Sequence, residues 1–163
     1  MANEIAVSNT NAIETIKSTP AFDIVRLADG TFKKEIKYAE SCTFVPQNNE
    51  EKKYLFAIQN DQDSDQVVPM KEAVGLKLKI KNFFTSPYDK FDEKTGENEH
   101  GVTTSIQSED GLWYATSSKA VYFTLQNIIK TFGFPGEDGY EAIDFTITST
   151  KLKNGNQINI KVI

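Results

Sequence analysis

The chain is poor in the residues that most often build catalytic and metal sites. Its 163 residues include one cysteine, Cys42, and one histidine, His100. A single cysteine cannot form an internal disulfide bond, which suits a reducing compartment. Zinc sites of the usual kinds need several cysteine or histidine ligands, and a Ser-His-Asp or Cys-His apparatus would have to use His100 itself. The sequence therefore disfavours these classes of protein, and we expect no catalytic residues, no metal and no cofactor.

Longer signals are also missing. The sequence has neither a GxGxxG nor a GxxxxGK[ST] motif, so nucleotide-binding folds of those kinds have no support. No run approaches the roughly 18 apolar residues of a membrane span, and we expect no membrane partner. The first residues lack the basic start and apolar segment of a signal peptide, so we expect none. The acidic stretch 61–65 lacks the glycine that a calcium loop needs at its sixth position, which indicates a solvated turn.

What the chain does contain is typical of one globular domain with an extension. The aromatic residues (11 Phe, 6 Tyr and 1 Trp) exclude a wholly disordered chain. The net charge is −5, from 18 basic and 23 acidic residues, which argues against a generic polycation that coats nucleic acid. Eleven of the acidic residues lie in residues 1–70 and five more in residues 89–99. The expected strands of the second half are therefore lysine-bearing.

The first part of the chain has weak signals. Residues 9–17 fit a short helix that Pro20 would end, and residues 28–31 fit a turn. Two short aromatic-rich runs on either side of a turn cluster at 46–50 predict a β-hairpin. These runs are 41–45 and 53–58. We assign residues 1–35 to a partly ordered N-terminal arm and residues 36–163 to the main domain with this extra hairpin.

The second part has clearer periodicity. In residues 75–84 the apolar residues alternate with lysines, which predicts a strand with one buried face. Residues 88–100 are acidic and read as a connecting loop. Val121, Leu125, Ile128 and Phe132 form a helical stripe that begins after Ser117 or Ser118 and ends near Gly133. The remaining expected elements are strands at 102–107, 112–116, 142–152 and 157–163, a turn at 109–111 and an Asn-Gly hairpin turn at 153–156.

The order strand, strand, strand, helix, strand, strand predicts an oligonucleotide-binding (OB) fold. This fold is a five-stranded Greek-key barrel that binds oligonucleotides and oligosaccharides. The expected fold class is all-β with one main helix, extended by the N-terminal arm and hairpin.

The expected outward residues of these strands suit single-stranded nucleic acid. Ammonium groups neutralise phosphates, and flat rings stack on unpaired bases whatever their identity. Trp113 and Tyr114 are neighbours in a strand, so one of them is expected to face outward. The same pattern also fits a plainer interpretation, since most aromatic residues pack in a core and lysine rows line ordinary exposed strands. The nucleic-acid-binding candidates are Lys77, Lys79, Lys81, Phe83, Trp113, Tyr114, Lys151 and Lys153.

Residues 74–163 carry short motifs in an order that resembles a known family. The motifs are Val102-Thr103-Thr104-x-Ile106, Glu109-Asp110-Gly111, Tyr114, Ser118-Lys119-x-Val121, Phe145-x-Ile147 and Lys153-x-Gly155-Asn156. They are similar to those of single-stranded-DNA-binding proteins from small tailed bacteriophages that replicate by protein priming. The resemblance implies an oligonucleotide-binding barrel that coats displaced strands in the cytoplasm of the infected bacterium. It also implies that Tyr114 stacks on bases.

Two classes of function remain open at this point. The first is a non-enzymatic protein that binds single-stranded DNA without sequence preference during phage DNA replication, alone or as an oligomer. The second is a phage protein–protein module that inhibits a host enzyme through an acidic, DNA-mimicking surface at 61–65 and 89–99. A virion structural protein is a weaker third interpretation.

Overall fold

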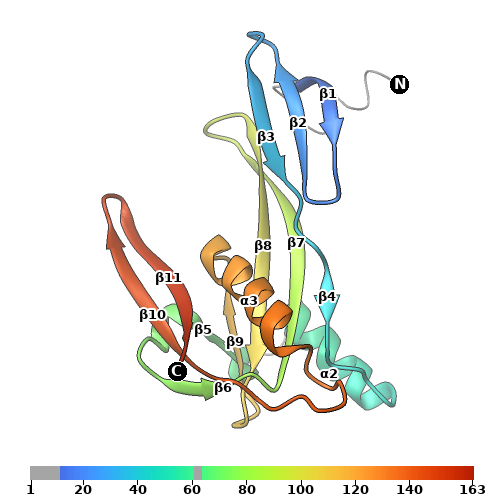
Figure 1. Cartoon of the computed structure of the whole chain (residues 1–163), viewed down its shortest axis with the longest axis vertical. Helices are drawn as coiled ribbons and strands as arrows, with labels where there is room; N and C mark the ends of the chain where they lie inside the picture. The colour runs from blue at the N-terminus through green and yellow to red at the C-terminus, as the bar shows by residue number, and fades with distance from the viewer. Residues whose placement is uncertain (1–11, 61–63) are drawn as a thin grey trace. The chain divides into compact units, whose positions relative to one another are not determined.

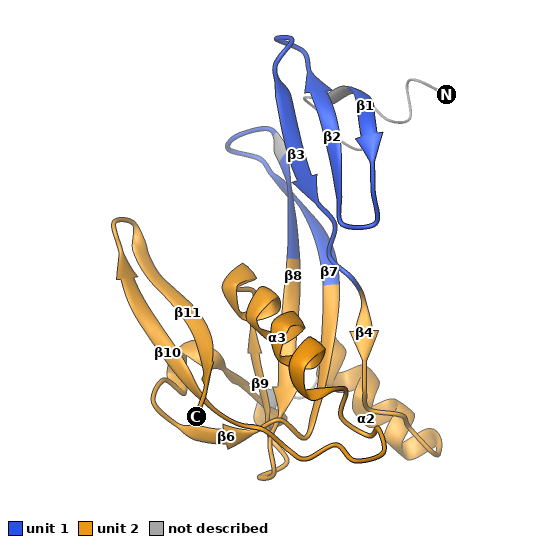
Figure 2. Ribbon diagram, viewed as in Figure 1, with its two compact units in different colours: residues 1–39, 87–101 blue, residues 40–86, 102–163 orange. Residues whose placement is uncertain are grey.

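The computed structural model describes residues 12–60 and 64–163 (Figure 1). The chain is mostly β, with several sheets and, in its described part, two α-helices. This confirms the mostly-β fold class expected from the sequence. The described chain forms two compact units (Figure 2): unit 1 holds the residues up to Ala39 with Pro87–Gly101, and unit 2 holds Glu40–Ser86 with Val102–Ile163.

Unit 1 is built on a three-stranded antiparallel sheet in the order β1-β2-β3. The prediction of a helix over residues 9–17 is wrong, because the described part of that segment is a strand that pairs with β2. β-Branched residues such as Thr15 and Ile16 favour the extended backbone here, and residues 9–11 lie outside the described residues. The turn expected at 28–31 is confirmed between the next two strands. The strands are β1 (Ala12–Ser18), β2 (Phe22–Leu27) and β3 (Phe32–Ile36).

The acidic segment 88–100 is not a loop, as we expected, but part of a long hairpin. Its strands are β7 (Asn82–Asp92) and β8 (Glu97–Gln107), which lie next to each other in the sheet. The turn closes where the Gly96 amide donates to the Asp92 carbonyl at 2.8 Å, and Gly96 has a positive φ of 71°. Polar residues occupy both faces of these strand ends, so the sequence shows no apolar alternation there.

Unit 2 contains two sheets. One has the order β4-β7-β8-β9-β5 and the other the order β11-β10-β6. Within the described residues no pairing joins β9 to β11, so the strands do not form a closed barrel. The further elements are β4 (Ser41–Cys42), η1 (Ser64–Gln66), β5 (Val67–Pro69), η2 (Met70–Glu72), β6 (Lys77–Lys79), β9 (Trp113–Thr116), β10 (Asp144–Leu152) and β11 (Gly155–Val162).

The predicted helix of the second half is confirmed as α3 (Lys119–Phe132). Ser118 occupies the N-cap position, and Gly133 at the C-cap has a φ of 89° and donates to the Ile129 carbonyl. Val121, Leu125 and Ile128 of the predicted stripe are buried in the main core. Phe132, the last residue of the helix, is 44% exposed, because the helix ends there and its side chain lies beyond the core. The helix lies beside β11 (Figure 1).

A second helix, α2 (Asn49–Gln59), replaces the hairpin expected between 41–45 and 53–58. The Asn48 side chain caps it by accepting from the Glu51 amide at 2.9 Å. The Glu51 carboxylate in turn accepts from the Gln47 amide at 2.6 Å. These two bonds begin a helix where the sequence shows a turn cluster, and the aromatic residues that suggested a strand lie on its faces.

The C-terminal hairpin is confirmed. Leu152 of β10 pairs with Gly155 of β11, so a two-residue turn of Lys153 and Asn154 joins the strands. The register continues to Phe145 opposite Val162. Within the described residues no helix is long and apolar enough to cross a membrane.

Candidate nucleic-acid interface

The outward face of the β11-β10-β6 sheet carries two lysines that flank one threonine. Thr146 of β10 pairs with Lys77 of β6 on one side and with Lys161 of β11 on the other. Paired residues point to the same face of a sheet, and neighbouring strands lie about 4.8 Å apart. Both lysines are exposed. The register therefore holds two ammonium-bearing side chains on one surface, one strand spacing to each side of Thr146.

The two faces of this sheet differ in character. On the inner face Phe145, Ile147 and Ile160 are buried in the core. On the outer face Thr148 pairs with Asn159, and Thr150 with Gln157. These three strands carry four lysines, of which Lys77, Lys79 and Lys161 lie on the outer face, and a single acidic residue, Asp144. The outer face thus combines positive charge with hydrogen-bonding groups, which are the side chains that bind phosphate and sugar.

Lys79 lies on the same face but already has a carboxylate partner. Its ammonium group lies 3.3 Å from Asp144, the residue opposite it on β10. These two residues and Lys77 line a hollow of about 570 Å³ that also contains Glu109 and Asp110, but of the two lysines only Lys79 forms an ion pair within the described residues. An exposed ion pair of this kind adds little stability, but it neutralises the charge of Lys79. Lys77 and Lys161 are therefore the stronger candidates for phosphate contacts.

The other predicted lysines are all exposed. Lys151 lies near the tip of the β10–β11 hairpin opposite Asn156, and Lys153 lies in the turn itself. Lys81 sits at a bend between β6 and β7. The structure therefore brings four of the five predicted lysines onto one hairpin and the strand beside it, with Lys81 just beyond. Sequence reasoning did not select Lys161, although counting back from a two-residue turn at 153–154 places it opposite Thr146.

The expectation that an aromatic ring of β9 faces solvent is wrong. Trp113 and Tyr114 do point to opposite faces, but both faces are covered. Trp113 is 0% exposed and packs with Ile58 of α2, while Tyr114 is 3% exposed and packs in the main core against α3. A helix over each face of the strand thus removes both rings from solvent.

The Tyr114 hydroxyl is held inside unit 2. It donates to a carboxylate oxygen of Asp110 at 2.6 Å, and the other oxygen of Asp110 accepts from the Leu112 amide. Burial, followed by the hydrogen bond to Asp110, raises the pKa of Tyr114 to about 12. This contact fixes the turn between β8 and β9. The structure thus gives Tyr114 a packing role in place of the exposed position needed for stacking.

Phe83 is also buried, contrary to the expectation that it continues the outward lysine row. The Ile80 amide donates to Ile143, whereas the Lys81 amide donates to Gln107 of β8. The chain therefore changes strand partners at the bend, and the alternation does not run through it. Phe83 is 0% exposed and stacks on Phe134 with ring centroids 6.1 Å apart.

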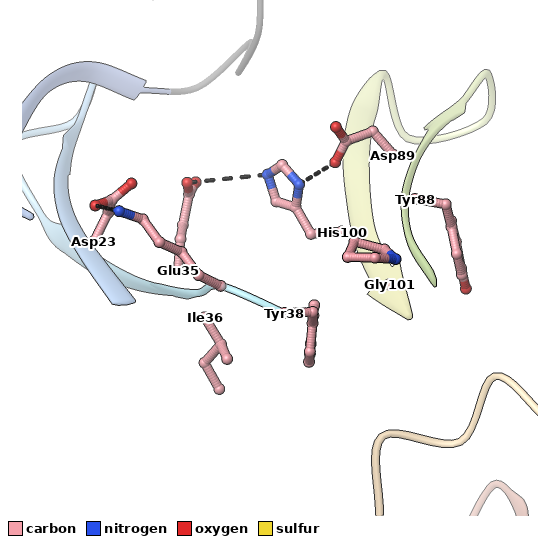
Figure 3. A pocket seen from close by; sticks show the side chains of 10 residues that line it. Asp23, Glu35, Ile36, Tyr38, Tyr88, Asp89, His100 and Gly101 are labelled. Atoms are coloured by element: carbon pink, nitrogen blue, oxygen red, sulfur yellow. Dashed lines mark hydrogen bonds and ion pairs between the residues drawn. The ribbon is translucent and has the colours of Figure 1, made fainter. Parts of the chain in front are cut away.

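Unit 1 holds a separate pocket of about 320 Å³ (Figure 3). His100 lies in it between two carboxylates: its Nδ1 contacts Asp89, and its Nε2 lies 4.0 Å from Glu35. Asp23 adds a third carboxylate to the lining, against the single ammonium of Lys37. An acidic lining is a poor environment for phosphate. In the residues that the structure describes, no group of three or more acidic, His or Cys side chains could hold a metal ion.

These observations define a mostly-β protein with an apolar sheet face turned to its core and a lysine-bearing face turned to solvent. No family model matches the sequence, and no solved structure matches it. The chain is 34% identical to the single-stranded DNA-binding protein of Bacillus phage GA-1, over all of this chain and 96% of the relative. The chain therefore belongs to the family of phage single-stranded DNA-binding proteins. The likeness includes residues 1–73, which lie outside the motifs recognised in the sequence.

Proposed function

We propose that this protein binds single-stranded DNA without sequence preference and catalyses no reaction. The observation that carries the proposal is the 34% sequence identity, over the whole chain, to a phage single-stranded DNA-binding protein. The lysine-bearing face of the β11-β10-β6 sheet supports it, because it supplies positive charge within a chain whose net charge is −5. Phosphate contacts carry no sequence information, so binding through this face is independent of base order.

The proposed interface is centred on Lys77 and Lys161 and continues to Lys153 in the turn of the hairpin, whereas the register turns Lys151 to the opposite face of β10. Lys79 contributes less, since Asp144 lies 3.3 Å from its ammonium group. Each phosphate neutralised on a single strand releases counterions, which makes the affinity fall with salt. Few lysines in an acidic chain predict moderate affinity at physiological salt.

We also propose that unit 2 is an open variant of the OB barrel. Strands β9, β8 and β7 are neighbours, β6 precedes β7 in the chain, and β6 pairs with β10, which pairs with β11. The helix α3 lies between β9 and β10 in the chain, which are the third and fourth strands when β6 and β7 are counted as one bent strand. This is the strand order of an oligonucleotide-binding fold, with β5 rather than the last strand paired to β9.

The biological setting that we propose is phage DNA replication in the cytoplasm of the infected bacterium, where the protein coats displaced strands. This setting rests on the resemblance of residues 74–163 and on the relative from a Bacillus phage. A protein in this role needs to cover strands of any sequence, which agrees with phosphate-centred binding.

A titration of end-labelled oligo-dT, followed by fluorescence anisotropy at low and at high salt, tests the function. We expect saturable binding that weakens with salt, competition by unlabelled oligo-dA, and weaker competition by duplex DNA. Absence of binding at low salt would overturn the proposal and favour the inhibitor interpretation. Binding restricted to one base composition would overturn its lack of sequence preference.

A further inference from the structure

The proposed interface has lysines but no exposed aromatic ring of the predicted set, because Phe83, Trp113 and Tyr114 are buried. Helix α3 presents an exposed aromatic ring in its second turn. Phe123 is 41% exposed, and its ring meets that of the buried Tyr122 edge-on, with centroids 5.3 Å apart and an interplanar angle of 78°. This contact helps to fix the orientation of the Phe123 ring while part of it remains open to solvent.

Two lysines lie on the same side of the helix as Phe123. Lys119 precedes it by four residues and Lys130 follows it by seven, which places both within about 40° of it around the helix axis. The lysines are about 16 Å apart along the axis at 1.5 Å per residue. The sequence of α3 contains no acidic residue, so the helix has a positive charge. We call Lys119, Phe123 and Lys130 the α3 stripe.

Two hydrogen bonds join α3 to the strand that carries Lys161. Ser118 donates to the Ile158 carbonyl at 2.5 Å, and Thr124 donates to the Asn159 side chain at 2.8 Å. Asn159 lies on the same face of β11 as Lys161, two residues away. The α3 stripe therefore begins beside the lysine-bearing sheet face, and a strand bound there is close to the helix.

The other exposed aromatic residues of unit 2 are less suitable. Phe132 follows Phe123 by nine residues and lies on the opposite side of α3, and Phe134 stacks on Phe83. Phe56 on α2 is 56% exposed and has Lys52 one turn before it. However, α2 carries as many acidic as basic residues. Phe56 therefore resembles Phe123 in exposure but lacks the positive surroundings that attract a phosphate backbone.

We infer that the α3 stripe is a second contact surface for single-stranded nucleic acid, on which one base stacks on Phe123 while Lys119 and Lys130 bind the flanking phosphates. The inference rests on the proposed function and adds a site to it. A ring between two cations is the combination by which proteins hold single strands without reading their sequence. The α3 stripe has this combination, and Ser118 and Thr124 bond its helix to the strand that carries Lys161.

The test compares the affinity of four variants for labelled oligo-dT with that of the wild type. We expect Phe123→Ala and Phe123→Leu to weaken binding at least about fivefold, the lower limit for loss of one stacked base. Phe123→Tyr keeps a flat ring and retains wild-type affinity. Phe56→Ala, the matched control on α2, also binds as the wild type does. The Leu variant keeps an apolar side chain against Tyr122, so its loss of affinity reports the ring rather than the fold.

A lysine pair gives an independent readout. Lys119→Ala/Lys130→Ala should reduce the magnitude of the salt slope by about 1.4, from 0.7 per phosphate contact, whereas Lys52→Ala/Lys53→Ala should leave it unchanged. Wild-type affinity in Phe123→Leu, or a change in oligomeric state in place of a change in affinity, would overturn the inference. Failure of the wild type itself to bind would instead overturn the proposed function, so the two outcomes are distinct.

Discussion

The indole N–H of Trp113 donates to the hydroxyl of Tyr54 at 2.8 Å, which joins β9 to α2 across 59 residues of sequence. Phe84 and Phe44 pack around the same indole, with ring centroids 5.3 and 6.3 Å from it. This contact explains why the ring is inside the molecule. Helix α2 covers one face of β9, and the single buried polar atom of Trp113 finds its partner on that helix.

Removal of the Tyr54 hydroxyl should destabilise unit 2 by leaving the buried N–H without a partner. We expect Tyr54→Phe to lower the free energy of unfolding by about 1–3 kcal/mol, the cost of one unsatisfied buried donor. Urea unfolding followed by far-UV circular dichroism measures this change.

The matched control for that change is the same substitution in a Trp113→Phe background. There the donor is already absent, so removal of the hydroxyl should cost markedly less. Equal costs in the two backgrounds would show that the hydroxyl stabilises unit 2 through another contact.

Trp113 should not report DNA binding by direct stacking. Its side chain is fully buried, so a base cannot reach it without displacement of α2. We expect saturating oligo-dT to leave the position and the intensity of its emission nearly unchanged under selective excitation of tryptophan. The free protein should also resist quenching by acrylamide. Strong quenching by DNA would mean that α2 moves away when a strand binds.

The raised pKa of Tyr114 links stability to alkaline pH. Its folded-state pKa of about 12 lies above the ordinary value of 10.0, so the native state keeps a proton that the unfolded chain loses. The resulting stabilisation is complete below pH 10 and is lost as the pH rises towards 12. We expect the wild type to be more stable than Tyr114→Phe below pH 10, with the difference shrinking above it. Urea unfolding of both proteins across this range measures the effect, and a constant difference would contradict it.

The Lys79–Asp144 ion pair should make Lys79 a weaker phosphate ligand than Lys77. We expect Lys77→Ala to reduce the magnitude of the salt slope of oligo-dT binding by about 0.7, and Lys79→Ala to reduce it by less. Asp144→Asn frees the Lys79 ammonium and should increase both affinity and slope. Equal effects of the two lysine substitutions would show that the ion pair opens at no cost when DNA binds.

The sequence predicts best where local signals and packing agree. The apolar positions of α3 and the last hairpin are strong local signals, and the structure contains both, although the turn consists of Lys153 and Asn154 while Gly155 belongs to β11. The signal for α2 was present in Asn48 and Glu51, three residues apart, which is the spacing of a capping box. The aromatic residues Tyr54 and Phe56 have a high strand propensity, which masked this helix signal. In the structure the packing of α2 over Trp113 stabilises the helix.

In the candidate site, the exposure of the lysines could be predicted from the sequence, but that of the aromatic residues could not. Lysine exposure could be predicted because a charged side chain rarely lies in a core, and the structure leaves Lys77, Lys151 and Lys153 exposed. The aromatic residues could not be assigned from alternation alone. Alternation places Trp113 and Tyr114 on opposite faces, but it does not show that separate elements cover both faces.

The salt dependence of oligo-dT binding tests the central claim most directly, namely that DNA binds on the lysine-bearing sheet face. The variant replaces Lys77, Lys153 and Lys161 with alanine, and a control variant replaces Lys52, Lys53 and Lys71, which changes the net charge equally. We expect the wild type to bind with a linear decrease of log affinity with log salt. The magnitude of that slope should fall by about 2.1 in the sheet variant, from 0.7 for each of three contacts, and stay near the wild-type value in the control. A wild-type slope in the sheet variant, or an equal decrease in both variants, would contradict the account.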